Sequence, residues 1–310
     1  MWEPSYIRLY ESGELDQRIE KLNQILESCE LCPRRCHVNR LENEKGICRS
    51  GKELIISSYA PHFGEEAPLV GIGGSGTIFL TNCNLLCVYC QNYEISHLGY
   101  GHIRSDAQVA NYMINLQDRG CHNINFVTPT HFTPQLVKAT KLAIEKGLRL
   151  PLVWNCGGYE NTETIALLED IVDIYMPDIK YAETEPAKQF SKTPDYFPIV
   201  KKVVKQMHQQ VGDLQLDAKG IAKRGLLIRH LVLPNDLAGS EKVLKFIAEE
   251  ISNNTYVNVM SQYRPEGKAH NYPELSRYPS REELTKAITI ATRLGLTRGL
   301  PSNQRIRFRW

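Results

Sequence analysis

From about residue 76 onward, short apolar runs alternate with stretches that have a helical pattern of apolar residues. Such runs are typical of strands buried in a sheet. Six such runs occur, namely GTIFL (76–80), INFV (124–127), LPLVW (150–154), DIYMP (173–177), LLIRHLVL (226–233) and YVNVM (256–260). Strands that alternate with helices are parallel and are joined by right-handed crossovers. The pattern therefore predicts an α/β fold, either a doubly wound sheet or a full or partial barrel.

The helices between these runs carry recognisable start signals. Two capping boxes predict helix starts, Ser105 with Gln108 and Ser280 with Glu283. Thr133 followed by Pro134 predicts an N-cap and a first helical residue. The stretch GDLQLDAKGIAKRG (212–225) predicts a short hairpin or surface insertion before the fifth strand.

The first 60 residues differ from the rest of the chain. They contain one predicted helix, LDQRIEKLNQILESC (15–29), and a Cys-rich loop with little apolar content. Such a segment needs a metal or a host domain to stay folded. We therefore expect a distinct N-terminal metal-binding segment.

The composition and the charge of the chain indicate which binding partners and which cellular location to expect. Of the 310 residues, 42% are hydrophobic and 23% are charged, which is ordinary for a globular protein, and the net charge of +2 gives no support for a nucleic-acid or membrane partner. No apolar run approaches the roughly 20 residues that span a bilayer. The opening residues lack a basic start and an apolar core, so we expect no signal peptide and a cytoplasmic location. In that reducing compartment, clustered cysteines favour metal binding over disulfides.

Three of the nine cysteines lie within eight positions, in TNCNLLCVYCQN (81–92). Cys83, Cys87 and Cys90 have the spacing C-x3-C-x2-C and follow the first predicted strand. Thiolates bind zinc, cuprous copper and iron–sulfur clusters, but structural zinc uses four closed ligands. Three cysteines hold a [4Fe–4S] cluster with one iron open to a small molecule, and an open position is what catalysis needs.

This loop, with Tyr89 just before its last cysteine, resembles that of the radical S-adenosylmethionine superfamily. The wider phrase GSGTIFLTNCNLLCVYCQN is most similar to the branch named after pyruvate formate-lyase activating enzyme. The resemblance implies a six-stranded partial (β/α) barrel, a [4Fe–4S] cluster and bound S-adenosylmethionine. It further implies reductive cleavage to a 5′-deoxyadenosyl radical, a reductant such as flavodoxin or ferredoxin, and hydrogen abstraction from a substrate.

The resemblance also suggests how the chain is divided. The barrel covers roughly residues 70–295, after the Cys-rich segment of residues 1–60 and before a basic tail of residues 296–310. The tail carries four arginines. We expect it to be exposed to solvent and to be held to the protein by the side chains of Phe308 and Trp310.

Polar residues at the ends of the later strands are the other site candidates, because chemistry gathers at the C-terminal ends of parallel strands. MPDIKY resembles the D-x-K element of activating enzymes near the methionyl group; the alternative is a salt bridge after a strand. The strand ends also offer His230, and Gln262 and Arg264 lie after the sixth strand; for these and Arg229 a structural role is equally open. The candidate cofactor-binding residues are Tyr89, Thr128, Asn155, Asp178, Lys180 and Arg229.

One departure from the family pattern concerns the second strand. The family often has Gly-Gly-Glu there, contacting the methionyl amine, whereas this chain has VTPTHF (127–132). We expect Thr128 or His131 to take that role. The CGGYE stretch (156–160) follows the third strand and is not equivalent; its glycines suit a tight turn or a close backbone approach.

A second cysteine group has the spacing C-x2-C-x3-C-x11-C, at Cys29, Cys32, Cys36 and Cys48. Four thiolates in twenty residues predict a metal site, with zinc or a second [4Fe–4S] cluster as the alternatives. His37 is an adjacent candidate ligand, although four sulfurs are favoured. Cys121 and Cys156 are expected to be buried core thiols.

Three functions follow from these patterns. The first is a radical enzyme of oxidoreductase type that acts on a protein or peptide, and activation of a glycyl radical enzyme is the reaction that the resemblance suggests. The second keeps the radical chemistry but modifies a small molecule or RNA. The third is a non-catalytic metal or redox module, which would show no turnover.

Overall fold

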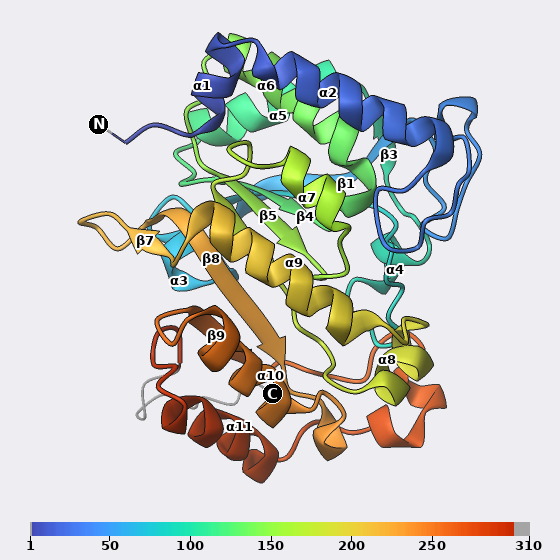
Figure 1. Cartoon of the computed structure of the whole chain (residues 1–310), viewed down its shortest axis with the longest axis vertical. Helices are drawn as coiled ribbons and strands as arrows, with labels where there is room; N and C mark the ends of the chain where they lie inside the picture. Colours follow the sequence, from blue (N-terminus) through green and yellow to red (C-terminus); the bar gives the residue numbers. More distant parts are fainter. Residues whose placement is uncertain (1, 301–310) are drawn as a thin grey trace.

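The parallel sheet is the centre of the fold. The computed structural model describes residues 2–300, and its six parallel strands form the partial (β/α)6 barrel that the sequence predicts (Figure 1). They are hydrogen-bonded in chain order: β2 (Ser75–Leu80), β4 (Ile124–Val127), β5 (Leu152–Cys156), β6 (Ile174–Pro177), β8 (Ala222–Leu231) and β9 (Tyr256–Met260). Among the described residues no pairing joins β9 back to β2, so the barrel is open along one side.

Two predicted strand starts are wrong by more than one residue. The third strand begins at Leu152 rather than at residue 150, because Pro151 has no N–H for the ladder, and the Leu152 N–H donates to Asp173 at 3.0 Å. The fifth strand begins at Ala222, four residues early, because β7 (Gln215–Leu216) pairs with it as the predicted hairpin.

The helices between the strands cover the outside of the sheet. Both predicted capping boxes are present, at Ser105 before α5 and at Ser280 before α11. Thr133 is not an N-cap, because a 3-10 turn runs directly into α6 and the Thr133 hydroxyl donates to the Thr130 carbonyl at 2.7 Å. The helices that follow the parallel strands are α4 (Tyr93–Ser96), α5 (Asp106–Asp118), α6 (Thr133–Glu145), α7 (Thr162–Leu167), α8 (Thr184–Ser191), α9 (Tyr196–Val211), α10 (Ser240–Phe246) and α11 (Arg281–Arg293).

An antiparallel edge that the sequence patterns did not predict extends the sheet beyond β2. Strand β1 (Leu54–His62) pairs antiparallel with β2, and β3 (His102–Arg104) pairs with β1. The turn after β1 leads into α3 (Ala67–Val70). Residues on both sides of the cysteine loop are therefore anchored to one sheet.

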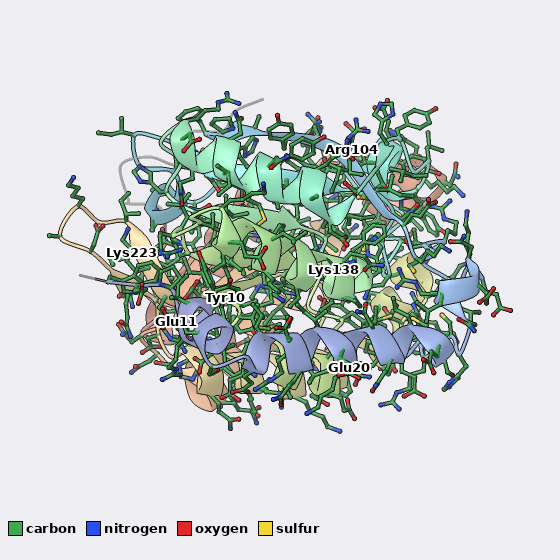
Figure 2. The ribbon with its side chains drawn as sticks, turned by 90° about the horizontal axis from the view of Figure 1, so that it is seen from above. Tyr10, Glu11, Glu20, Arg104, Lys138 and Lys223 are labelled. Atoms are coloured by element: carbon green, nitrogen blue, oxygen red, sulfur yellow. The ribbon has the colours of Figure 1, made fainter. Side chains whose placement is uncertain are left out.

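The N-terminal segment packs on the barrel. Helices α1 (Tyr6–Glu11) and α2 (Glu14–Gln24) lie beside α6 (Figures 1 and 2), so the prediction of a single helix here is wrong. Leu15 and Leu22 are buried in the same hydrophobic core as the barrel helices. The Tyr6 hydroxyl donates to the Leu150 carbonyl at 2.7 Å. The barrel is thus a host for this segment, while the domain boundaries at residues 60 and 70 stay predictions.

Two further expectations concern the C-terminal tail and membrane-spanning segments. Residues 301–310, including Phe308 and Trp310, lie outside the described part of the chain. Within residues 2–300, no helix combines the length and the apolar character needed to cross a membrane.

Candidate active site

The three cysteines of the C-x3-C-x2-C loop line one cavity. The loop follows β2 and turns through left-handed backbone at Asn82 (φ 65°) and Leu86 (φ 54°). This conformation brings Cys83, Cys87 and Cys90 to a cavity of about 230 Å³, which the ends of the parallel strands also line. The spacing therefore places three sulfur ligands where the fold concentrates its polar strand ends.

Each of the three sulfurs accepts a hydrogen bond from the chain. The Leu85 N–H donates to Cys83 Sγ at 3.3 Å. The Ser191 hydroxyl at the end of α8 donates to Cys87 Sγ at 3.0 Å, and the Ser96 hydroxyl in α4 donates to Cys90 Sγ at 3.2 Å. Donors aimed at sulfur stabilise thiolate ligands, so this arrangement fits an iron–sulfur cluster with one iron left without a protein ligand.

Burial opposes ionisation of two of these thiols, Cys83 and Cys90. It raises the pKa of Cys83 to about 12 and also raises the pKa of Cys90. A bound metal reverses this preference, because its positive charge favours the deprotonated sulfur. The site is therefore suited to hold a thiolate when a metal is bound to it.

A buried polar network lines the same cavity. Asp178 follows β6, and its two carboxylate oxygens accept from Lys180 Nζ at 2.7 Å and from Arg229 Nε at 2.7 Å. Arg229 also donates through Nη2 to Asn155 Oδ1 at 2.7 Å. The structure thus brings four of the six candidate cofactor-binding residues into one hydrogen-bonded set.

The charges in this network stabilise one another. Burial alone would raise the pKa of Asp178, but Arg229 and Lys180 hold it below its ordinary value. Burial alone would lower the pKa values of Lys180 and Arg229, but Asp178 raises both. All three side chains are therefore charged near neutral pH, which gives the cavity partners for both an ammonium and a carboxylate group.

The other two candidates line the same cavity. Thr128 has a left-handed backbone (φ 62°), and its N–H donates to the Asn155 carbonyl at 2.8 Å. Tyr89 lines the cavity with its buried ring, packed edge-to-face against Tyr263 and Tyr181. The cofactor roles of all six residues stay predictions.

The structure also places four other residues that the sequence singled out. His131 does not line this cavity but lines the cavity of the N-terminal cysteines, so of the two proposed residues only Thr128 lines the candidate cofactor cavity. His230 is buried, and its ring nitrogens contact the Ile179 carbonyl at 2.8 Å and the Ser240 hydroxyl at 2.9 Å, so it is a structural histidine. Gln262 lines the cavity, whereas Arg264 is exposed and pairs with Glu266 at 3.0 Å.

Sequence reasoning missed a carboxylate that approaches the network from the edge of the sheet. Glu65, in the turn after β1, lies with Oε2 3.6 Å from Arg229 Nη1 and Oε1 3.2 Å from His62 Nδ1. Burial raises the pKa of Glu65, although the Arg229 charge opposes this shift. No local motif marks Glu65, because its contact with Arg229 joins residues far apart in the sequence.

The two glycines after β5 permit close packing at the cavity. A Cβ on Gly157 would lie 2.4 Å from Leu85 of the cysteine loop. Gly158 has φ +75°, and a Cβ there would lie 2.5 Å from the Asp178 carbonyl. The expectation of a close backbone approach at CGGYE is confirmed at both positions.

Glu160, next to these glycines, carries a prediction about pH. Its Oε1 accepts from the Thr130 hydroxyl at 2.6 Å, Oε2 has no hydrogen-bond partner among the described residues, and burial raises its pKa from 4.5 to about 7. Its contribution to stability is therefore complete below pH 4.5 and is lost as the pH rises through about 7. We expect Glu160→Gln, which imitates the protonated carboxyl group, to remove this part of the pH dependence. Urea unfolding at about pH 5 and about pH 8 measures it, and an unchanged pH dependence would contradict the assignment.

The four N-terminal cysteines line a second, smaller cavity between the N-terminal segment and the barrel. Its walls contain all four sulfur-bearing residues, Cys29, Cys32, Cys36 and Cys48. All nine cysteines are free thiols. Within the described part of the chain, no three His, Cys, Asp or Glu side chains are already arranged around a single metal ion. His37 is exposed and pairs with Glu30 at 3.1 Å, and it does not line the cavity.

Comparisons with known proteins find a superfamily and two relatives that the chain resembles in sequence. The model of the radical SAM superfamily matches residues 77–214, which include most of β2, the cysteine loop, and all of β4, β5 and β6. Uncharacterized protein MJ0674 of Methanocaldococcus jannaschii is 35% identical over 294 residues, covering 91% of this chain and 79% of that protein. Uncharacterized protein MJ0808 of the same organism is 24% identical over 300 residues, covering 87% and 83% respectively.

A solved structure, "Native anSMEcpe with bound AdoMet", aligns with 69% of this chain at 16% identity and a TM-score of 0.44. The alignment covers 57% of that structure's chain, less than two thirds of its length. The superfamily match includes the loop of Cys83, Cys87 and Cys90. The chain belongs to the radical SAM superfamily, whose enzymes generate a 5′-deoxyadenosyl radical from S-adenosylmethionine.

Proposed function

We propose that this enzyme uses the 5′-deoxyadenosyl radical to abstract a hydrogen atom from a protein or peptide, in the manner of glycyl radical activating enzymes. The observation that carries the proposal is the cavity that the three cysteines and the Asp178–Lys180–Arg229 network both line. A [4Fe–4S] cluster needs sulfur ligands, and the amino and carboxylate groups of S-adenosylmethionine need charged partners. Both sets of side chains line this one cavity. The resemblance of the cysteine loop to the activating-enzyme branch supports the polypeptide substrate.

Different residues of the cavity would bind the cluster and S-adenosylmethionine. Cys83, Cys87 and Cys90 would hold the [4Fe–4S] cluster, and the cluster with S-adenosylmethionine supplies the radical when both are bound. Lys180 would bind a carboxylate group, and Asp178 would accept from an ammonium group. Apolar side chains complete the walls and limit the access of water, at Leu80, Val127, Leu231 and Met260.

The rim of the cavity supports a peptide over a phosphorylated substrate. Gln91, Asn92 and Gln262 are exposed there and carry carboxamides. Gln91 Nε2 donates to the Gln262 carbonyl at 2.7 Å, which ties the segment after β9 to the cysteine loop. Carboxamides offer both donors and acceptors, which matches a peptide backbone. An RNA or nucleotide substrate would be expected to require a cationic rim instead.

The proposal is tested by following the abstracted hydrogen. Anaerobically reconstituted enzyme, S-adenosylmethionine and a reductant of the flavodoxin or ferredoxin class are mixed with protein from cells grown on glycine deuterated at Cα. We expect 5′-deoxyadenosine that has gained deuterium. The low-molecular-mass fraction and the RNA fraction of the same cells serve as matched controls.

The outcomes separate the candidate substrates. Deuterium from the protein fraction alone supports a polypeptide substrate with abstraction at glycine. Faster 5′-deoxyadenosine formation with the small-molecule or RNA fraction, and none with protein, would contradict the proposal and favour the alternative radical modification. The absence of any 5′-deoxyadenosine from iron-loaded enzyme with every fraction would favour a redox module.

A further inference from the structure

The N-terminal cysteine cavity contains a buried positive charge with no carboxylate partner. Arg40 is 1% exposed, and its guanidinium donates to the Gly51 carbonyl at 2.7 Å and to the His131 carbonyl at 2.6 Å. Its Nη1 lies 4.0 Å from Cys29 Sγ. Among residues 2–300, no carboxylate lies within ion-pair distance of Arg40. A buried charge needs a counter-charge, and Cys29 and its neighbours would supply one as thiolates bound to a metal.

A side chain of the barrel adds an unused donor atom to the same cavity. His131 is 2% exposed and lines the cavity together with the four cysteines. Its Nε2–H donates to the Thr81 carbonyl at 2.7 Å, which leaves a lone pair on Nδ1. Nδ1 is buried and has no hydrogen-bond partner among the described residues. Metal-site histidines are commonly oriented by such an N–H to carbonyl bond, so His131 fits beside a metal centre.

The cavity is joined directly to the loop of the first cluster. Arg49 donates through Nη2 to the Ser96 carbonyl at 3.1 Å, and the Ser96 hydroxyl donates to Cys90 Sγ. Asn82, next to Cys83, donates through Nδ2 to the Ser50 hydroxyl at 3.2 Å. Two short chains of bonds therefore connect the residues after Cys48 to the ligands of the first cluster (Figure 1 shows the two loops side by side).

A third link starts inside the cysteine group. Arg34, between Cys32 and Cys36, donates through Nε to the Asn84 carbonyl at 3.0 Å and through Nη2 to the Ser191 carbonyl at 2.8 Å. Asn84 belongs to the cysteine loop, and Ser191 is the hydrogen-bond donor to Cys87. One arginine thus holds the N-terminal cysteines against the supports of the first cluster.

A purely structural metal has little to add at this place. The N-terminal segment already shares the main hydrophobic core and is tied to the barrel by Asn161, whose amide donates to the Glu30 carbonyl at 2.8 Å, and by Thr164, whose hydroxyl donates to the Leu31 carbonyl at 3.0 Å. Structural zinc is most valuable where such a core is missing. The links to the first cluster's loop favour a redox centre instead.

We propose that Cys29, Cys32, Cys36 and Cys48 bind a second [4Fe–4S] cluster, with Arg40 as its counter-charge, that passes electrons to the cluster at Cys83, Cys87 and Cys90. A reduced flavodoxin or ferredoxin is oxidised by one electron, the second cluster carries that electron, and the first cluster accepts it. No bond or proton changes hands in this transfer. The electron acceptor in this step, the cluster at Cys83, Cys87 and Cys90, is part of the proposed function. The presence of the second cluster does not depend on that function.

The first test is the metal content of anaerobically purified protein. We expect about eight iron and about eight sulfide per chain in the wild type, because each cube contains four of each. Cys36→Ala and Cys87→Ala should each retain about four, since each removes a ligand from a different cube. Cys121→Ala removes a buried thiol outside both cavities and should retain the wild-type content. One zinc with about four iron in the wild type would overturn the second cluster, as would a full content in Cys36→Ala.

The second test uses electron paramagnetic resonance of the dithionite-reduced proteins. Cys36→Ala and Cys87→Ala should each show the signal of one isolated reduced cluster. We expect the wild-type spectrum to be broadened relative to the sum of these two, because neighbouring paramagnets interact. A wild-type spectrum equal to the sum would overturn the relay.

These measurements separate the two proposals. Two clusters without 5′-deoxyadenosine formation would leave the second cluster standing and remove the radical function. 5′-Deoxyadenosine formation by protein with one cluster and one zinc would do the reverse. Cys36 is half-exposed, so its alanine variant is the one of the four that disturbs the core least; if it does not fold, the wild-type metal content still decides.

Discussion

Replacing Cys87 by alanine is expected to reduce 5′-deoxyadenosine formation to the level of a protein-free blank. The Cys87 sulfur is buried, and it accepts a hydrogen bond from Ser191 at 3.0 Å. A cluster at this site has three protein ligands, so the loss of one leaves two of its four irons without a protein ligand. The measurement is chromatography of anaerobic reactions that contain dithionite and S-adenosylmethionine. Cys83→Ala and Cys90→Ala are expected to behave in the same way.

The control for this prediction is Cys121→Ala. Cys121 is buried in the core just before β4 and lines neither cysteine cavity. Its alanine variant loses a comparable thiol and should keep its activity. Wild-type activity in Cys87→Ala, or the same loss in Cys121→Ala, would contradict the assignment of the cluster ligands.

Asp178→Asn is expected to lower both stability and activity, with nearly no change in side-chain size. The carboxylate of Asp178 is the direct partner of Lys180 and of Arg229, each at 2.7 Å. Removing one member of a buried ion pair costs about 3–5 kcal/mol of unfolding free energy, because the remaining charge stays buried. Urea unfolding at neutral pH measures the loss, and S-adenosylmethionine binding to the reconstituted enzyme measures the effect on the cofactor.

The pH dependence of this variant has a defined sign. Arg229 and Lys180 overcome the effect of burial and hold the pKa of Asp178 below its ordinary value of 3.8. The stabilisation is therefore complete above that value and is lost as the pH falls through the lower pKa of the folded state. The difference between wild type and variant should shrink under strongly acidic conditions.

The matched control is Asp16→Asn, which breaks an ion pair with Lys141 at the surface. The Asp16 side chain is 60% exposed, compared with 13% for Asp178. Exposed pairs contribute roughly 0–1 kcal/mol, so this variant should unfold almost as the wild type does. Equal losses in the two variants would show that burial of the Asp178 network has no special energetic role.

The candidate residues that share the cavity were accessible to sequence reasoning for a physical reason. Parallel strands place their C-terminal ends at one edge of the sheet, so residues that end different strands meet there. Thr128 and Asp178 directly follow β4 and β6, Asn155 lies near the end of β5, and all three line one cavity. Arg229 lies within the predicted fifth strand and reaches the same place. The cavity could therefore be assembled from strand order alone.

The placement of His131 and the omission of Glu65 have a different origin. Residues just after a strand can face the barrel axis or the outer segments, and the 3-10 turn of residues 130–132 directs His131 toward the N-terminal cysteines. Glu65 meets Arg229 because β1 adds an antiparallel edge to the sheet, which the periodicity of residues 1–60 did not predict. Both cases depend on packing between segments far apart in the chain.

The amino-acid sequence by itself determined the six parallel strands, the capping boxes of α5 and α11, and two separate groups of cysteines. These features are local, because apolar runs, caps and ligand spacings involve residues near one another along the chain. The tertiary structure alone decided that Ser96 and Ser191 donate to the sulfurs, and that Arg40 and His131 lie beside the second cysteine group. Such contacts arise only when the folded chain excludes water from distant segments, since each buried polar atom must then find a partner that no local pattern encodes.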